Sequence, residues 1–459
     1  MKQSHNFTEG RIFGPLIRFA LPVLFALFLQ TMYGAVDLLV VGKFGGELSD
    51  VYVSAVSTGS QLMMTVTAVI AGLAMGLTVY VGRKIGAGLK EEAGQIIGSG
   101  IFLFGVISVM LTVVMVFTAS PLAGVMHAPG EAFDDTVKYI AICSAGSVFI
   151  VAYNLVGSIF RGIGDSKIPL LTVIIACVLN ILGDLLLVAV FNLGAAGAAY
   201  ATIFAQAISV FLSLIIIRRR ELPFTFSKKD IRPKAIHIKE IMFLGIPIAL
   251  QDLLVSISFL VIIAIVNNLG LTESAGVGVA EKLCGFIMLV PSAYMQSMSA
   301  FVAQNIGAEK LERARKALGC GIASSFAVGI VICYFTFFHG DILAGIFANG
   351  TEVIAAASEY LKAYAIDCLL TSFLFCFIGY FNGCGNTKFV MLQGIIGAFC
   401  VRLPISWIMS KQVPVSLFHL GLATPASTTV QIVMCMVFFR LLLRNQRTDG
   451  IPLQNKMER

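Results

Sequence analysis

Apolar runs of about twenty residues alternate with short polar segments along most of the chain. Runs of this length are typical of membrane-spanning helices, because a helix rises about 1.5 Å per residue and the hydrocarbon core is about 30 Å thick. They lack the alternation that is typical of barrel strands. We therefore predict an all-α polytopic membrane protein with twelve transmembrane helices. The predicted helices cover residues 14–41, 53–80, 95–119, 136–159, 168–191, 195–217, 241–267, 275–300, 315–338, 357–380, 389–410 and 416–443.

The composition is that of a membrane protein. Hydrophobic residues form 58% of the chain and charged residues 12%, and the mean hydropathy is +0.91; a soluble domain carries about 25% charged residues. The ten cysteines are scattered without a CxxC pair or a histidine spacing that suits zinc, so we interpret them as apolar packing residues. No small-residue cleavage site follows the first apolar run, which favours a retained span over a signal peptide.

The basic residues are concentrated in alternate loops. Of the 32 Lys and Arg residues, 26 fall on one side of the predicted helices and only four on the other. The positive-inside rule then predicts that both termini and the basic segment 218–240 are cytoplasmic. Since the net charge of +7 arises from these loops, it does not indicate nucleic-acid binding.

Two pairs of similar segments show an internal repeat. VGRKIGAGLKEEAGQ at 81–95 resembles VAQNIGAEKLERARK at 302–316, and FRGIGDSK at 160–167 resembles FNGCGNTK at 381–388. Both pairs are separated by 221 residues. Each repeat holds six predicted helices, an even number, so both halves enter the membrane from the same side and are related by an axis along the membrane normal.

The repeat also predicts the domain organisation. We expect an N-lobe at 1–217 with helices one to six, a cytoplasmic linker at 218–240, a C-lobe at 241–444 with helices seven to twelve, and a cytoplasmic tail at 445–459. Two bundles related by this symmetry are common in transporters, where a central site lies between them.

Two carboxylates lie deep within apolar sequence. Asp37 in the first predicted helix follows Pro22 by fifteen residues, and Asp184 in the fifth follows Pro169 by the same number. Both therefore lie about 22 Å beyond their prolines, in the outer half of the membrane. A carboxylate inside hydrocarbon costs roughly 2.5–3.5 kcal/mol on insertion scales, so it normally faces a partner or a watery cavity and marks an ion pathway.

Further oxygen donors accompany these carboxylates. Asn180 precedes Asp184 by one turn on the same helix face, and Thr202 in the sixth predicted helix also falls in the outer half. Carboxylate, amide and hydroxyl oxygens suit a hard cation, so Asp37, Asn180 and Asp184 would hold Na⁺ if the protein is sodium-coupled. Two neighbouring buried carboxyl groups also retain a proton, because like-charge repulsion and desolvation both oppose ionisation. These residue types do not distinguish Na⁺ from H⁺, and simple hydrogen bonding between helices remains the structural alternative.

The first predicted helix and the four repeated segments, in this order and spacing, resemble the multidrug and toxic-compound extrusion (MATE) family over roughly residues 12–444. The resemblance implies two six-helix bundles around a V-shaped cleft, in the plasma membrane of a bacterium. It implies drug resistance by antiport, with amphipathic, often cationic organic compounds exported in exchange for Na⁺ or H⁺ by alternating access. It also implies an N-lobe cation- or proton-binding site, whose residues correspond here to Asp37, Asn180, Asp184, Thr202 and Asn154.

The C-lobe departs from the family pattern. Asp252 lies only five residues after Pro247, and Asp367 lies about a turn from the expected position. We therefore expect the coupling ion in the N-lobe. Glu281 and Lys282 form either an internal ion pair or a substrate contact. The residues considered for a substrate cleft, where adaptable methionines suit varied ligands, are Gln30, Gln61, Met32, Met63, Met64, Met288, Met295, Glu281 and Lys282.

Other functions predict different features. A flippase or exporter for a lipid-linked precursor or metabolite, from the same superfamily, would have a more cationic cleft. A membrane-embedded enzyme needs convergent His, Glu or Cys groups, and a channel passes ions without countertransport. The chain has no HExxH or Walker A sequence, so we expect neither catalysis nor ATP-driven transport. The expected partners are small organic molecules and membrane lipids, without nucleic acid or a cofactor beyond the coupling ion, and the expected state is a monomer.

Overall fold

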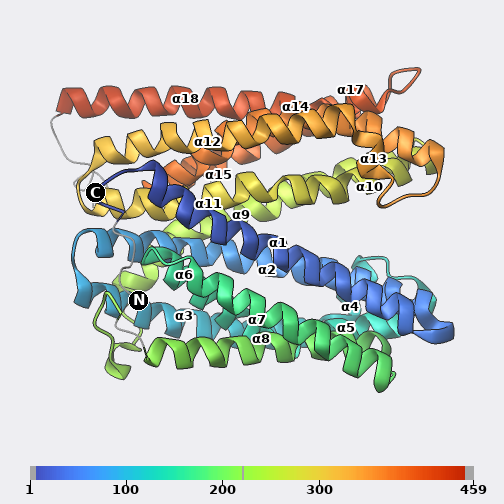
Figure 1. The fold of residues 1–459 in the computed structure, drawn as a ribbon, viewed down its shortest axis with the longest axis horizontal. Helices are drawn as coiled ribbons and strands as arrows, with labels where there is room; N and C mark the ends of the chain where they lie inside the picture. Colours follow the sequence, from blue (N-terminus) through green and yellow to red (C-terminus); the bar gives the residue numbers. More distant parts are fainter. Residues whose placement is uncertain (1–6, 220–221, 450–459) are drawn as a thin grey trace. The chain divides into compact units, whose positions relative to one another are not determined.

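The structure is a computed structural model that describes residues 7–219 and 222–449, and these ranges are helical apart from short connections (Figure 1). No β-strand occurs within them. The predicted all-α fold is therefore confirmed. Residues 220–221 of the predicted linker and 450–459 of the predicted tail lie outside the described residues.

The helices follow the apolar runs of the sequence. The first half holds α1 (Phe13–Phe44), α2 (Ser49–Gly86), α3 (Lys90–Phe117), α4 (Ala119–Val125), α5 (Phe133–Ala145), α6 (Ser147–Gly162), α7 (Lys167–Asp184) and α8 (Gly194–Arg218). The second half holds α9 (Ala235–Asn267), α10 (Leu271–Ile287), α11 (Leu289–Gly307), α12 (Leu311–Phe338), α13 (Gly340–Ala344), α14 (Thr351–Gly383), α15 (Thr387–Ile395), α16 (Leu403–Met409), α17 (Leu417–Gly421) and α18 (Ala423–Asp449). Short 3₁₀ segments are η1 (Gly46–Leu48), η2 (Gly130–Ala132) and η4 (Lys228–Asp230), and π-helical segments are η3 (Leu185–Val190) and η5 (Ile396–Arg402).

Twelve membrane spans can be assigned to these helices. Eleven segments within the described ranges are long and apolar enough to cross a membrane. The twelfth consists of Gly130–Ala145 and Ser147–Gly162, which are bent by 52° at the break between them. The number of predicted spans is confirmed, and the bend in the fourth span is a feature that hydropathy does not reveal.

The chain divides into two compact units. Unit 1 consists of the chain up to Leu253 together with Ser292–Gly321 and Gly379–Lys388, and unit 2 consists of the remainder. Unit 1 therefore contains all of α1 to α8. The predicted lobe and linker boundaries stay a prediction, and the two units are described separately below.

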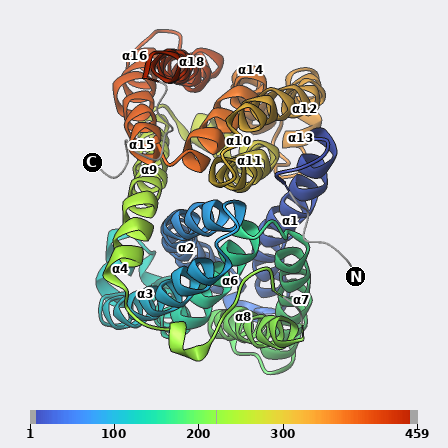
Figure 2. The same ribbon diagram turned by 90° about the vertical axis from the view of Figure 1, so that its left-hand side faces the viewer.

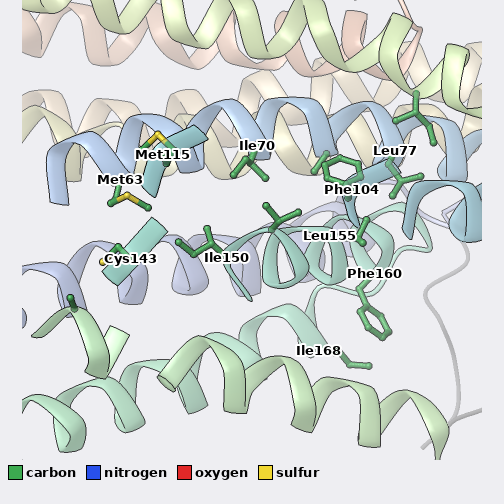
Figure 3. Packing of buried hydrophobic residues seen from close by; sticks show 14 of the residues in the cluster. Met63, Ile70, Leu77, Phe104, Met115, Cys143, Ile150, Leu155, Phe160 and Ile168 are labelled. Carbon is green, nitrogen blue, oxygen red and sulfur yellow. The ribbon is translucent and has the colours of Figure 1, made fainter. Parts of the chain in front are cut away.

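Unit 1 is held together by helices that are distant in sequence. α7 packs against α1 and α8, while α2 packs against α5 and α6, and Figure 2 shows α2, α3, α6, α7 and α8 grouped together. Met63, Ile70 and Leu77 recur every seven residues on α2 and therefore share one face. They belong to one buried cluster with Phe104 of α3 and Leu155 of α6 (Figure 3).

The repeated sequence segments meet in unit 1 through equivalent contacts. The Gln304 side-chain amide donates to the Gly162 carbonyl at 2.9 Å, and the Arg83 guanidinium donates to the Gly383 carbonyl at 3.4 Å. Arg83 and Gln304 are equivalent in the repeat, and so are Gly162 and Gly383, because each pair is 221 residues apart. The contacts therefore follow the repeat, and each donor satisfies a carbonyl at the end of a helix.

Glycine permits the closest approach between these segments. A Cβ atom on Gly86 would overlap the Gln304 carbonyl, and one on Gly307 would overlap the Arg83 carbonyl. The same hypothetical atoms would lie 2.7 Å from the carbonyl carbons of Gln304 and Arg83 respectively. Since the obstacle is backbone, no side-chain rotation relieves it. The two glycines thus allow the ends of α2 and α11 to touch directly.

The N-terminal segment of unit 1 is anchored through Phe7. Its side chain is fully buried, with its ring centroid 5.1 Å from that of Phe19 and 5.0 Å from that of Phe301. Its carbonyl accepts hydrogen bonds from Arg313 Nε at 2.8 Å and Asn305 Nδ2 at 3.2 Å. Both the ring and the backbone therefore attach this segment to α11 and α12.

Replacing Phe7 with alanine is expected to destabilise the folded protein by about 3–5 kcal/mol, because it removes a large buried ring and leaves a cavity. Thermal unfolding of the purified protein in detergent would show this as a lower midpoint. Phe13→Ala is the matched control, since Phe13 is 57% exposed. Equal midpoints for the two variants would show that the Phe7 contacts contribute little.

Candidate ion-binding site

The two carboxylates predicted from the sequence lie on packed helices of unit 1. α7 packs against both α1 and α8, which brings Asp37, Asp184 and Thr202 together. Asp37 is 4% exposed and Asp184 is fully buried. The two carboxyl groups lie close enough to interact directly with each other. The coincidence of depth along the chain therefore corresponds to proximity in the fold.

A chain of hydrogen bonds links the amide, the hydroxyl and one carboxylate. Asn180 Nδ2 donates to Thr202 Oγ1 at 3.2 Å, and Thr202 Oγ1 donates to Asp37 Oδ2 at 3.3 Å. The direction follows from the inventory of donors, because a carboxylate only accepts and the hydroxyl carries a single proton. Asp37 Oδ2 is thereby held in place and its second oxygen is left for another partner.

Four buried oxygen atoms on Asp37, Asn180 and Asp184 have no hydrogen-bond donor among the described residues. Within the described ranges, no N–H or hydroxyl group donates to Asp37 Oδ1, Asn180 Oδ1 or either carboxyl oxygen of Asp184, which faces the Asp37 carboxyl group. A buried polar group left unsatisfied costs about 1–3 kcal/mol, and more when it is charged. Oxygen atoms in this arrangement can accept a shared proton or contribute to the coordination of a hard cation.

The donor set decides which cations fit. Among the described residues, no group of three or more His, Cys, Asp and Glu side chains is placed to hold a metal ion. Two carboxylates, an amide and a hydroxyl instead supply only hard oxygen atoms, which suit Na⁺ or a shared proton and not a soft transition metal.

A π-helical segment follows Asp184 directly, and no pattern in the sequence predicts it. α7 ends at Asp184, and η3 continues the span with wider turns, in which the Phe191 amide donates to the Leu186 carbonyl at 3.0 Å. Such segments are rare and are frequently found at functional sites. The run LLLVAV is ordinary helical sequence in composition, so only the backbone shows where the helix changes its pitch.

Asn154, the fifth residue implied by the family resemblance, is not part of the hydrogen-bonded chain. Its Nδ2 donates to the Ile150 carbonyl at 2.9 Å on its own helix, α6. It lines a separate cavity of about 90 Å³ within unit 1. Gln30 lines the same cavity and donates to the Tyr153 hydroxyl at 3.1 Å. The cavity is lined by Val23, Ala26, Leu27, Gln30, Ala71, Tyr153, Asn154, Gly157, Arg161, Pro169, Thr172, Val173 and Gln296.

The remaining cleft candidates have varied surroundings. Met63 is buried in the hydrophobic core of unit 1, whereas Met64 is 65% exposed. Gln61 is exposed, and Met32 and Met295 are partly buried. Met288 packs against the buried cluster of unit 2. Their role in a substrate cleft stays a prediction.

Glu281 in unit 2 interacts with tyrosines. Within the described residues it accepts hydrogen bonds from the hydroxyls of Tyr360 at 3.2 Å and Tyr364 at 3.3 Å, while Lys282 is exposed. Of the two alternatives for this pair, the geometry does not favour an internal ion pair.

Two further charged side chains are buried in unit 2. Arg402, at the end of η5, donates to Ser258 Oγ at 3.1 Å and lies 4.2 Å from the centre of the Phe259 ring. Asp367 is 2% exposed, and its Oδ1 has no hydrogen bond within the described ranges. Unit 2 thus buries charge without repeating the hydrogen-bonded chain of unit 1.

Twelve apolar spans, an internal repeat and a buried cluster of oxygen atoms are features of polytopic membrane transporters. The chain belongs to the MATE family: the MatE family model matches residues 22–186 and 247–408, one segment in each predicted repeat. The identification made from the sequence motifs is confirmed. As a member of this family, the protein is a multi-pass membrane transporter and not an enzyme.

Curated relatives match over almost their whole length. The chain is 23% identical to the probable multidrug resistance protein YoeA of Bacillus subtilis over 437 residues, which cover 94% of each chain. It is 25% identical to the multidrug export protein MepA of Staphylococcus saprophyticus over 421 residues, which cover 89% of this chain and 90% of the relative.

Solved structures show the same fold. An outward-facing multidrug resistance MATE family transporter of the MOP superfamily superposes with a TM-score of 0.90 at 20% identity, over 97% of this chain and all of that one. A MOP superfamily transporter from Pyrococcus furiosus, described as having a binding pocket of reverse polarity, gives 0.90 at 21% identity over 98% and 100% of the chains. At this identity the comparison supports the fold alone.

Proposed function

We propose that the protein is a secondary active efflux antiporter that exports amphipathic organic compounds, cationic ones included, in exchange for Na⁺ or H⁺. The observation that carries the proposal is the set of four buried, unpartnered oxygens on Asp37, Asn180 and Asp184. These oxygens can accept a proton or a cation. The chain also belongs to a transporter family in which its relatives are named as multidrug resistance and multidrug export proteins.

The mechanism follows from linkage between ion binding and conformation. A proton or Na⁺ binds the Asp37–Asp184 site in the outward-facing state and favours release of substrate to the outside. Return to the inward-facing state releases the ion to the cytoplasm and admits new substrate. The ion drives this cycle only if it binds the two states with different affinity. Each charge that moves inward contributes about 2.3 kcal/mol per 100 mV of membrane potential.

The orientation in the membrane belongs to the same proposal. The excess of basic residues on one side favours cytoplasmic termini and a cytoplasmic linker, in the plasma membrane of a bacterium. The coupling ion then reaches the site from outside the cell, because the residue counts from Pro22 and Pro169 predict that Asp37 and Asp184 lie in the outer half of the membrane. A monomer would suffice, because the site lies within one unit of one chain.

Purified protein in liposomes tests the proposal directly. A tenfold gradient of Na⁺ or of H⁺ is imposed in separate experiments, and ethidium movement is followed by fluorescence. We expect one of the two gradients to drive up to about tenfold dye accumulation for one-to-one exchange, since a tenfold gradient is worth about 1.4 kcal/mol. An ionophore for the driving ion should abolish the accumulation. Equal dye movement with and without both gradients would contradict antiport.

A second candidate is a flippase or exporter for a lipid-linked precursor or metabolite. The observation that favours it is the charge of the unit 1 cavity. The cavity is lined by the positively charged Arg161 and by neither aspartate nor glutamate, which suits an anionic head group. Gradient-independent movement of a labelled anionic lipid in the same liposomes would support this function in place of antiport.

A further inference from the structure

Arg161 is a positively charged residue in the unit 1 cavity whose charge has no partner among the residues that the structure describes. It precedes the end of α6 by one residue and lines the cavity of about 90 Å³. Within the described ranges its guanidinium makes neither a hydrogen bond nor an ion pair, and its Nε atom is buried. A buried charge without a counter-charge is costly, so this position favours a ligand that supplies one.

The lining of the cavity has the character expected of an anion site with an apolar wall. Tyr153 and Thr172 contribute hydroxyl groups, and Gln30 contributes an amide. Val23, Leu27, Pro169 and Val173 form the apolar side, and the lining contains neither aspartate nor glutamate. The Tyr153 hydroxyl and the second amide proton of Gln30 can donate to an anion, whereas the Thr172 hydroxyl already donates to the Pro169 carbonyl at 2.8 Å. The apolar side chains can contact the carbon atoms attached to the anion.

Gly157 leaves the space that the guanidinium occupies. A Cβ atom at this position would lie 3.2 Å from Arg161 Nη1 and 3.8 Å from its Cζ and Nη2 atoms. Any larger side chain at 157 would therefore displace the charged group or fill the space beside it. Position 157 provides a way to alter the cavity without removing its charge.

We propose that this cavity binds the anionic group of an amphipathic ligand, a carboxylate or a phosphate, with Arg161 as its charge partner. The planar guanidinium offers two parallel N–H groups to such an anion, which a lysine does not. Drug-sized pockets are usually about 300–1,000 Å³, so a 90 Å³ cavity accommodates a head group and its nearest carbons. The inference deepens the proposed function by naming a substrate class, and the ligand comes either from the membrane or from solution.

Binding of a matched pair of fluorescent ligands tests the proposal. Dansylglycine carries a carboxylate, and its methyl ester has the same chromophore without the charge. In detergent, without any ion gradient, we expect the wild type to bind the acid roughly tenfold or more tightly than the ester, as hydrogen bonds to charged groups imply. Arg161→Gln should remove this preference, and Arg161→Lys should retain only part of it. Arg219→Gln, at an exposed arginine, is the matched control and should behave as wild type.

Gly157→Val keeps the result interpretable if Arg161 variants fold poorly. This variant retains the charge of Arg161 but fills the space beside the guanidinium. Its affinity for dansylglycine should therefore be lower, while Arg219→Gln should bind dansylglycine as the wild type does. Equal binding of acid and ester by the wild type, or an unchanged preference in correctly folded Arg161→Gln, would overturn the proposal. Because binding is measured without a gradient, this result is independent of whether antiport is found.

The source of the anion is identified by a second measurement. Wild type and Arg161→Gln are purified from vesicles of phosphatidylglycerol and phosphatidylcholine, and retained lipid is identified by native mass spectrometry. One phosphatidylglycerol retained by the wild type and lost in Arg161→Gln, with displacement by dansylglycine, supports a lipid head group. A preference for dansylglycine without retained phosphatidylglycerol supports a soluble organic anion.

Discussion

Asp37→Asn is expected to reduce ion-driven dye transport in liposomes to the rate of liposomes without protein. The substitution keeps the size of the side chain, and its amide oxygen can still accept from Thr202, so the fold should survive. It removes the negative charge and replaces a buried oxygen, Oδ1 or its equivalent, with a donor that repels a cation. The ion gradient drives transport only through an ion that binds the two conformations with different affinity. A variant that no longer binds the ion therefore loses gradient-driven transport, even where it still binds substrate.

Two companion variants separate charge from hydrogen bonding. Asp184→Asn should be as inactive as Asp37→Asn, because both carboxylates supply unpartnered oxygens. Thr202→Val keeps both charges and removes the hydroxyl that holds Asp37 Oδ2. Loss of a hydrogen bond to a charged group costs about 1.5–3 kcal/mol, which corresponds to a roughly ten- to hundredfold weaker apparent ion affinity with a nearly unchanged maximal rate.

Asp50→Asn is the matched control for charge removal, because Asp50 is an exposed carboxylate at the start of α2. It should transport as the wild type does. Thermal unfolding provides a second readout: if Na⁺ is the coupling ion, Na⁺ should raise the midpoint of the wild type and of Asp50→Asn but not that of Asp37→Asn, since a ligand stabilises only a state that binds it. Undiminished gradient-driven transport by Asp37→Asn would place the coupling ion elsewhere.

Several residues of the site could be found from the sequence because membrane burial makes polar residues conspicuous. Asp37 and Asp184 stand out in apolar runs, and equal distances from Pro22 and Pro169 indicate a common depth. Depth along a helix depends only on residue count, so it is reliable without knowledge of packing. The structure brings these two residues together with Thr202, while their role in ion binding stays a prediction.

Other features depend on helix rotation, which the sequence does not specify. Asn154 lies in the span bent by 52°, and a bend changes the face that each following residue presents. Asn154 lines the cavity and does not join the hydrogen-bonded chain. The fourth predicted span ends at residue 159, so hydropathy places Arg161 in a basic loop, yet it belongs to α6 and lines the same cavity. Span boundaries from hydropathy are uncertain by two to four residues, and that margin separates a loop cation from a cavity cation.

The repeat was recognisable in the sequence, but its consequence for packing was not. Similar segments 221 residues apart predict similar local structure. They do not reveal that the equivalent residues Arg83 and Gln304 bind helix ends in opposite repeats. Arg83 donates to the carbonyl of Gly383 at the end of α14, and Gln304 donates to that of Gly162 at the end of α6. Contacts of this kind depend on how two helices approach in space, and the glycines at 86 and 307 are explained only by that approach.

Gly307→Val is the second change for which we expect a very large effect, namely loss of transport by a protein that still inserts and purifies. A valine side chain at this position overlaps the Arg83 backbone, so α2 and α11 must separate. Separation also breaks the hydrogen bonds from Gln304 to Gly162 and from Arg83 to Gly383. The conformation that contains these contacts is then strongly disfavoured, although the membrane spans themselves remain intact.

Transport by alternating access needs both end states, so loss of one stops the cycle. Over-packing typically costs about 1–3 kcal/mol, and more where the obstacle is backbone that cannot rotate away. Each 1.4 kcal/mol disfavours the state that contains the contact tenfold, and about 5.5 kcal/mol moves an equilibrium from 1:99 to 99:1. Transport is measured in liposomes for Gly307→Val and for Gly319→Val, a matched control on α12 with no atom within 4 Å of its Cβ position. We expect the control to be active.

The symmetry of the contact supplies an independent check on this explanation. Gly86 faces the Gln304 backbone in the way that Gly307 faces that of Arg83, so Gly86→Val should inactivate the protein as well, from a different helix. Gln304→Ala removes the hydrogen bond to Gly162 but creates no overlap, and it should reduce the transport rate much less. Wild-type rates for both valine variants would show that the cycle does not pass through the observed contact. Inactivity of Gln304→Ala alone would mean that the hydrogen bond, and not the close approach of the two backbones, holds the ends of α2 and α11 together.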